Sequence, residues 1–180
     1  TTDSLNSFVH NYKFSDTEKL IVKMIPLSRL RVLDKNKEKS HSSFRNKYNI
    51  DFDYTIVVCG MNGSSNEQIK VLVKSIGEKI FDKVVFVFPL TYGSNQKQLN
   101  NTIKYIQGAI RNNRVIIISN YLSEEEILEL RFATDILINL RKKDQVGAAF
   151  LESLSMQSYV ITGSWLPYKF LNELGVFFKM

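Results

Sequence analysis

Three consecutive cations, Arg141, Lys142 and Lys143, follow directly after an apolar segment of the chain. Guanidinium and ammonium groups bind phosphate, and Arg does so through two parallel hydrogen bonds. Downstream, Glu152 stands alone in a stretch of small and apolar residues that predicts a buried helix. A carboxylate in that place is either stabilised by the helix dipole or accepts hydrogen bonds from sugar hydroxyls. These residue types indicate binding of a diphosphate and a sugar, whereas a solvated surface run is the alternative for the cations.

A second candidate loop, residues 60–66 (GMNGSSN), follows the first predicted strand. Its two glycines permit positive φ or a close approach of the backbone to a ligand. Ser64 and Glu67 fit a capping box, which would open a helix whose N-terminal amides could hold an anion. The loop matches neither the dinucleotide fingerprint nor a Walker loop, so an ordinary strand-to-helix turn is the alternative. Its candidate binding residues are Gly60, Asn62, Gly63 and Ser64.

Two further loops place aromatic rings after predicted strands. Residues 89–94 offer Tyr92 and Gly93, with packing of the Tyr92 ring as the alternative. The next loop could flank a base with its backbone groups and a ring, although a turn capped by Ser123 and Glu126 explains it equally well. The candidates in that loop are Asn120, Tyr121 and Leu122.

Short apolar segments precede these loops and predict strands at residues 54–59, 83–88, 115–119, 135–140 and 159–162. The apolar residues are consecutive rather than alternating, which indicates strands buried on both faces, as in a parallel sheet. Alternation of strands with helices predicts an α/β fold, a Rossmann-like doubly wound parallel sheet. Ligands bind beyond the carboxyl ends of such strands, where the loops described above lie. The pattern also predicts helices at 66–81 and 167–174 and a last strand at 176–178.

The positive charge of the chain is unevenly distributed. The 180 residues include 24 Lys and Arg against 18 Asp and Glu, for a net charge of +6. Residues 1–50 hold ten of these cations and five of the acids (+5), which leaves fourteen and thirteen (+1) for residues 51–180. The sequence therefore predicts a basic, partly helical lead-in at 1–50, with a surface linker at 34–46, before a domain at 51–180.

Several classes of protein are excluded by composition. The single cysteine, Cys59, rules out a disulfide framework and a zinc cluster, and its place inside a strand predicts a packed thiol. The histidines, His10 and His41, both lie in the lead-in, which argues against a hydrolase, and no metal site is predicted. No apolar run reaches the roughly 18 residues of a membrane span.

Residues 133–162 resemble the nucleotide-sugar-binding half of GT-B glycosyltransferases. In that superfamily two acidic residues lie eight positions apart, the first just before a glycine and the second within a helix. Asp144, Gly147 and Glu152 follow this pattern, with Asp in place of the usual Glu. The resemblance covers about residues 44–180 and implies one half of a GT-B fold.

The resemblance assigns roles to these residues. Glu152 would bind the ribose hydroxyls of the donor nucleotide, and Asp144 would touch hydroxyls of the donor sugar. The cations Arg141, Lys142 or Lys143 would neutralise the leaving diphosphate, which is electrostatic catalysis without a metal. Gly147 completes the candidate site.

The loops at 60–66 and 89–93 are similar to those of bacterial enzymes that transfer N-acetylfucosamine-type sugars to lipid-linked acceptors. The resemblance thus implies a hexosyl-type glycosyltransferase of bacterial surface polysaccharide biosynthesis, with a nucleotide sugar as donor substrate and no cofactor. It implies a cytoplasmic protein, with peripheral contact to the inner face of the cell membrane as one option. GT-B enzymes bind the acceptor with an N-terminal domain, for which this chain has no room, so the donor-binding half is expected here.

Two alternatives remain open. The first is a non-catalytic Rossmann-like module that binds nucleotide or serves assembly. The second is nucleic-acid binding through residues 1–50, which the absence of aromatic residues among the charges disfavours, so no nucleic-acid partner is predicted. The Arg and Lys that hold phosphate in retaining members are not evident after the first strand, which leaves retention or inversion of configuration undecided.

Overall fold

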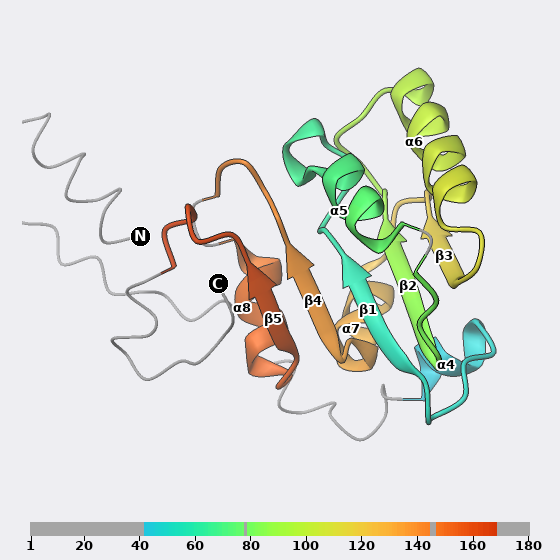
Figure 1. Ribbon diagram of the computed structural model, residues 1–180. Coiled ribbons are helices and arrows are strands. Elements are labelled where there is room, and N and C mark those ends of the chain that lie inside the picture. Colours follow the sequence, from blue (N-terminus) through green and yellow to red (C-terminus); the bar gives the residue numbers. More distant parts are fainter. Residues whose placement is uncertain (1–41, 78, 145–146, 169–180) are drawn as a thin grey trace, which may run out of the picture.

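Five parallel strands form the centre of the molecule (Figure 1). The computed structural model describes residues 42–77, 79–144 and 147–168. The strands lie in the spatial order β3-β2-β1-β4-β5, and each is parallel to its neighbours. The α/β, doubly wound parallel sheet predicted from the sequence is confirmed. The bounds are β1 (Thr55–Cys59), β2 (Val84–Pro89), β3 (Arg114–Ile118), β4 (Ile136–Asn139) and β5 (Tyr159–Thr162).

Helices cover both faces of this sheet. One face carries α5 (Ile69–Ile76) and α6 (Gln96–Ala109), and the other carries α7 (Glu124–Ala133) and α8 (Ala148–Ser155) (Figure 1). A short helix, α4 (Ser43–Lys47), contacts α7. The result is a three-layer arrangement. Because all strands are parallel, the strand-to-helix loops all lie at the same end of the sheet, beyond the carboxyl ends of the strands.

The central strand β1 supplies both hydrophobic cores from alternate residues. Ile56 and Val58 belong to the cluster beneath α7 and α8, whereas Val57 and Cys59 belong to the cluster beneath α5 and α6. None of the four is more than 6% exposed. Burying an aliphatic side chain contributes about 1.5–3 kcal/mol. The Cys59 thiol is packed as predicted, and burial raises its pKa.

A single buried arginine ties the amino ends of two strands together. The Arg45 guanidinium donates hydrogen bonds to the backbone carbonyls of Asp51 and Tyr54, each at 3.0 Å. It also pairs with the Asp135 carboxylate at 3.0 Å, and the same carboxylate oxygen accepts from the Ile56 amide at 2.7 Å. Because Ile56 lies in β1 and Asp135 directly precedes β4, this pair fixes α4 to the middle of the sheet.

The predicted surface linker at 34–46 was wrong where the structure describes it. Residues 43–46 belong to α4, and Phe44 is only 3% exposed because its ring enters the core. The predicted helix at 167–174 lies almost wholly, and the strand at 176–178 wholly, outside the described residues. Within the part of the chain that the structure describes, no helix is long and apolar enough to cross a bilayer.

The predicted helix at 66–81 is shorter than its sequence pattern indicated. Helix α5 ends at Ile76 because Gly77 adopts a φ of +54°, and Ile80, expected on the apolar stripe, is 75% exposed. The capping box predicted at Ser64 and Glu67 was also wrong. Ser64 makes no side-chain cap, and a 3-10 turn over Ser65–Glu67 precedes α5 instead.

The second predicted capping box is confirmed at the start of α7. The Ser123 hydroxyl accepts from the Glu126 amide at 3.2 Å, and the Glu126 carboxylate accepts from the Ser123 amide at 2.9 Å. An equivalent box at the start of α6, formed by Asn95 and Gln98, was not predicted. Each box satisfies backbone donors that the first turn of a helix leaves unpaired.

Replacing Arg45 tests how much the fold depends on this tie. We expect Arg45→Ala to lower the free energy of unfolding by about 2 kcal/mol, since it removes charged hydrogen bonds from a buried site while Asp135 stays partly solvated. Urea denaturation of the 180-residue chain measures this.

Lys47→Ala is the matched control, because Lys47 lies on α4 like Arg45 and forms an exposed ion pair with Glu126 of α7. Exposed pairs contribute little, so no measurable change is expected. Equal effects of the two substitutions would show that Arg45 does not hold the strands together.

Candidate functional site

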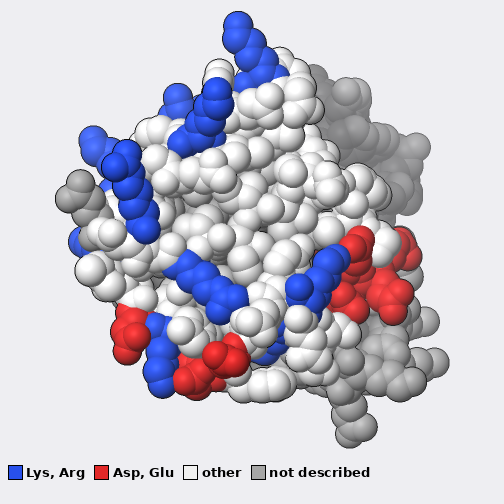
Figure 2. Space-filling model, turned by 90° about the vertical axis from the view of Figure 1, so that its right-hand side faces the viewer, with Lys and Arg blue, Asp and Glu red and all other residues white. Residues whose placement is uncertain are grey.

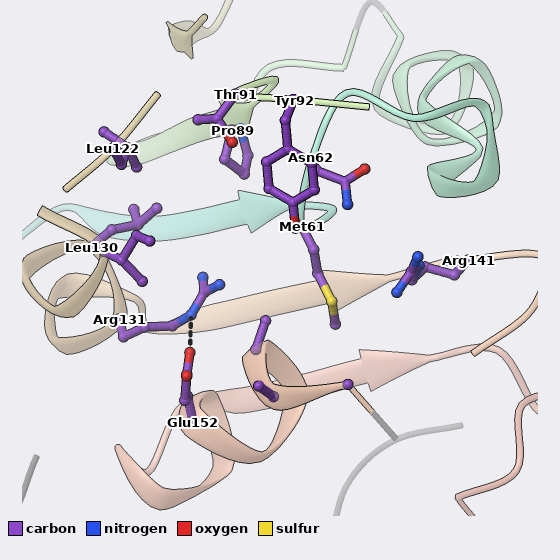
Figure 3. Close-up of a pocket in the computed structure, with 14 residues that line it drawn as sticks. Met61, Asn62, Pro89, Thr91, Tyr92, Leu122, Leu130, Arg131, Arg141 and Glu152 are labelled. Carbon is purple, nitrogen blue, oxygen red and sulfur yellow. Dashed lines mark hydrogen bonds and ion pairs between the residues drawn. The ribbon is translucent and has the colours of Figure 1, made fainter. Parts of the chain in front are cut away.

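A cavity of about 210 Å³ lies at the carboxyl ends of the strands (Figure 3). Its walls come from the loops after β1, β2, β3 and β4, from α7 and from the first turns of α8. This is the place where the sequence predicted ligand binding. Six of the predicted residues line the cavity: Asn62, Tyr92, Leu122, Arg141, Gly147 and Glu152.

A buried ion pair forms one wall of the cavity. The Nε of Arg131, on α7, lies 3.3 Å from the Oε2 of Glu152, on α8 (Figure 3). The two side chains are 7% and 2% exposed. Removing one partner of such a pair costs about 3–5 kcal/mol, because the other charge is left buried and uncompensated. The pair therefore holds a carboxylate in a fixed position at the edge of the cavity.

A second cationic side chain, Arg141, is held between two carboxylates. Its Nε lies 3.3 Å from Glu67 Oε1, and its Nη1 lies 3.1 Å from Asp144 Oδ1. Arg141 keeps 22% of its side chain exposed, while the Glu67 and Asp144 side chains are 0% and 4% exposed. The two acids therefore orient one guanidinium group toward the cavity and offset its charge.

Glu67 also closes the loop after β1. Its Oε2 accepts a hydrogen bond from the Met61 amide at 3.0 Å. Gly60, with a φ of +81°, packs against the same carboxylate, and a Cβ there would lie 3.0 Å from it. Burial raises the pKa of Glu67 to about 7, against the lowering effect of the Met61 hydrogen bond and of Arg141.

Asp144 is not among the residues that line the cavity. Its carboxylate pairs with Arg141 and accepts a hydrogen bond from the Tyr168 hydroxyl. That hydroxyl in turn accepts from the Asn139 amide at 3.0 Å. The Tyr168 ring stacks on Phe150 at 3.9 Å between centroids, and burial, with the Asp144 hydrogen bond, raises the pKa of Tyr168. The predicted contact of Asp144 with a donor sugar stays a prediction.

The remaining predicted residues lie outside this cavity. Gly93, with a φ of +89°, packs against Ser64, and the Gly63 amide donates to the Tyr92 carbonyl at 2.8 Å, so these residues join the two loops. Lys143 is exposed and its amide donates to Asn66. Gly63, Ser64 and Lys142 line a separate cavity, while Asn120 and Tyr121 are exposed and line neither cavity.

Two residues that organise the site were not predicted from the sequence. Arg131 received no role, although a cation between Leu130 and Phe132 in a predicted helix is a signal of a buried partner. Glu67 was assigned to helix capping, and only the structure shows its carboxylate turned inward. Among the described residues, no group of three His, Cys, Asp or Glu side chains could hold a metal ion.

Comparison with known proteins yields matches of structure only. No protein-family model and no curated protein sequence matches the chain. A glycosyltransferase from Rickettsia africae matches 87% of this chain and 41% of its own, at 16% identity and a TM-score of 0.64. WaaG, a glycosyltransferase involved in lipopolysaccharide biosynthesis, matches 74% of this chain and 35% of its own, at 13% identity and a TM-score of 0.54.

A third match is a single domain. The C-terminal domain of the group 1 glycosyltransferase LpcC from Francisella tularensis matches 71% of this chain and 68% of its own, at 19% identity and a TM-score of 0.53. The fold is that of a GT-B half-domain. The half of a GT-B fold that the sequence predicted is thereby confirmed, and the chain spans less than half the length of the first two glycosyltransferases.

In this half-domain, Glu67 predicts a dependence of stability on pH. A carboxyl group whose pKa is raised from 4.5 to about 7 by folding stabilises the folded state fully below pH 4.5. That contribution is lost as the pH rises to about 7. The free energy of unfolding of the native chain should therefore fall across this window relative to Glu67→Gln, which cannot ionise.

Urea denaturation at several pH values measures this difference, which also cancels the contributions of other carboxylates. The matched control is Glu125→Gln, since Glu125 is exposed at the first turn of α7. A difference between native chain and Glu67→Gln that stays flat from pH 4.5 to 7 would contradict the prediction.

Proposed function

We propose that this chain is the donor-binding half of a glycosyltransferase, and that the 210 Å³ cavity takes part of a nucleotide sugar. The observation that carries the proposal is the buried carboxylate of Glu152, held by Arg131 on the wall of this cavity in a GT-B half-domain. A carboxylate in a water-poor site forms strong, charge-assisted hydrogen bonds with hydroxyl groups. A ribose offers two of them.

The phosphate groups of the donor would meet Arg141. Of the three predicted cations, Arg141 lines the cavity, whereas Lys142 lines the separate, larger cavity and Lys143 is exposed. A guanidinium group already oriented by Glu67 and Asp144 needs no reorganisation as negative charge develops on a leaving diphosphate. We therefore propose that transfer, if it is of the hexosyl type implied by the resemblance, needs no divalent metal.

The rest of the transferase is proposed from the matched structures. They extend well beyond the region that this chain covers, so we propose that a further domain binds the acceptor. A glycan or lipid-linked acceptor of bacterial surface polysaccharide fits the resemblance of the loops and the lipopolysaccharide role of WaaG. A peripheral position at the cytoplasmic face of the membrane would suit such an acceptor.

A non-catalytic nucleotide-binding module is the second candidate. It is favoured by one observation, the engagement of the Asp144 carboxylate with Tyr168 and Arg141 rather than with the cavity. Assay of sugar transfer by a protein that contains this half-domain separates the two. Transfer that survives Asp144→Asn and Glu152→Gln unchanged supports the non-catalytic module.

Calorimetric titration of the 180-residue chain with UDP, GDP and dTDP tests donor binding. We expect one nucleotide to bind. Glu152→Gln should lower the affinity for that nucleotide about tenfold, which corresponds to about 1.4 kcal/mol for the lost charged hydrogen bonds. Glu125→Gln is the control and should leave the affinity unchanged, with circular dichroism to verify folding. Absence of binding by all three nucleotides would refute the proposal.

The role of Arg141 is tested by comparing ligands with and without phosphate. We expect Arg141→Gln to weaken the bound nucleoside diphosphate about tenfold and to leave the corresponding nucleoside unaffected, because only the diphosphate contacts the guanidinium group. Arg141→Lys should restore part of the affinity, and EDTA should change none of these values. An equal loss for nucleoside and diphosphate would mean that Arg141 only maintains the shape of the cavity.

A further inference from the structure

A second and larger cavity, of about 690 Å³, lies between α5 and α6. It is a groove that no step of the proposed donor binding uses. The loop after β1 separates it from the first cavity, since Met61 and Asn62 line the first and Gly63 and Ser64 line the second. In the loop after β4, Arg141 likewise lines the first cavity and Lys142 lines the second. The groove therefore lies next to the first cavity, on the other side of these two loops.

The lining of this groove is rich in hydrogen-bonding side chains. Amides and hydroxyls are its commonest groups, and they are contributed by Ser64, Ser65, Gln68, Gln98, Asn101 and Thr102. Tyr105 adds an aromatic ring that is 37% exposed. Amides and hydroxyls both donate and accept hydrogen bonds, so this surface suits a ligand that carries many hydroxyl groups.

The groove is also cationic. Lys70 and Lys142 line it, and no Asp or Glu among the described residues does. Residues 68–77 and 90–114, which include α5 and α6, contain no acidic residue, whereas the two helices carry Lys70, Lys74, Lys97 and Lys104. Figure 2, which looks onto the edge of the sheet beside α6, shows Lys and Arg without acidic neighbours over the upper part of this face, and further Lys and Arg lower down among the acidic residues. Such a field attracts anions to the groove.

We propose that this groove binds an acidic oligosaccharide, a glycan chain that carries carboxylate or phosphate groups. The amides and hydroxyls would recognise sugar hydroxyls, and Lys70 and Lys142 would recognise the acidic groups. Since the groove opens beside the donor cavity, it suits an acceptor or product chain that extends away from the site of transfer. This inference goes beyond donor binding, and the groove can bind a glycan whether or not the first cavity binds a nucleotide.

Nucleic acid, another polyanion, fits the groove less well. Single-stranded nucleic acids bind by stacking successive bases on several aromatic rings. Tyr105 is the aromatic residue among those that line the groove, and the Lys70 ammonium group lies 6.0 Å from the centroid of its ring. A single ring beside a cation offers no platform for successive bases.

Titration of the 180-residue chain with hexagalacturonic acid tests the proposal. We expect this acidic hexasaccharide to bind at least tenfold more tightly than the neutral maltohexaose, and more tightly than a ten-residue oligothymidylate at equal ionic strength. Binding of oligothymidylate as tight as that of hexagalacturonic acid, or no binding of hexagalacturonic acid at all, overturns the proposal.

Neighbouring residues provide matched variants. Lys70 lines the groove and Lys74, one turn along α5, does not; Asn101 lines it and Asn100 does not. We expect Lys70→Gln and Asn101→Ala each to lower the affinity for hexagalacturonic acid at least fivefold. Lys74→Gln and Asn100→Ala should change this affinity less than twofold. Equal losses for Lys70→Gln and Lys74→Gln would indicate general attraction by surface charge and would overturn the proposal.

The nucleotide titration of the same variants separates this inference from the proposed function. Lys70→Gln and Asn101→Ala should leave nucleotide affinity unchanged, because neither residue lines the first cavity. If the chain binds nucleotide but not hexagalacturonic acid, the proposal for the groove is refuted and the proposed donor binding stands.

Discussion

The site depends on one constraint of the sheet, the position of β1 between β2 and β4. The chain builds β1, β2 and β3 toward one edge and then returns past β1 to add β4 and β5 on the other side. The loop after β1 leads to α5 on one face, and the loop after β4 leads to α8 on the opposite face. A crevice opens where two such loops diverge, which is the usual place for ligands in open parallel sheets. Met61, after β1, and Arg141, after β4, both line the cavity found there.

Charge within the crevice is balanced by pairing rather than by solvent. Arg131 is held by Glu152, and Arg141 is held by Glu67 and Asp144. The first pair joins α7 to α8, whereas the second connects the loops after β1 and β4. Because each guanidinium group is fixed by at least one acid from another element, ligand groups would meet charges that are already oriented. The same pairing ties the shape of the cavity to the packing of the helices, so the site and the core are stabilised together.

The fold was predictable because burial on both faces of a parallel strand leaves a direct mark on the sequence. The consecutive apolar residues of 54–59 and 135–140 identified β1 and β4, and the loops after them were correctly placed at the cavity. The directions of individual side chains were harder to predict from the sequence. Glu67 has the spacing of a capping residue from Ser64, yet its carboxylate turns inward to the Met61 amide, since a tertiary contact outweighed the local motif. Arg131 acquires its role from Glu152, 21 residues away, and no local pattern encodes that distance.

The reactivity of Cys59 can report how often the sheet separates from its helices. This single cysteine lies at the carboxyl end of β1, fully buried, with a thiol pKa raised by its surroundings. Only the exposed thiolate reacts with alkylating reagents, so modification requires the central strand to separate from its helices. The rate of alkylation therefore measures how often the middle of the sheet becomes accessible, and protection by a bound ligand would be read at one natural atom without any added label.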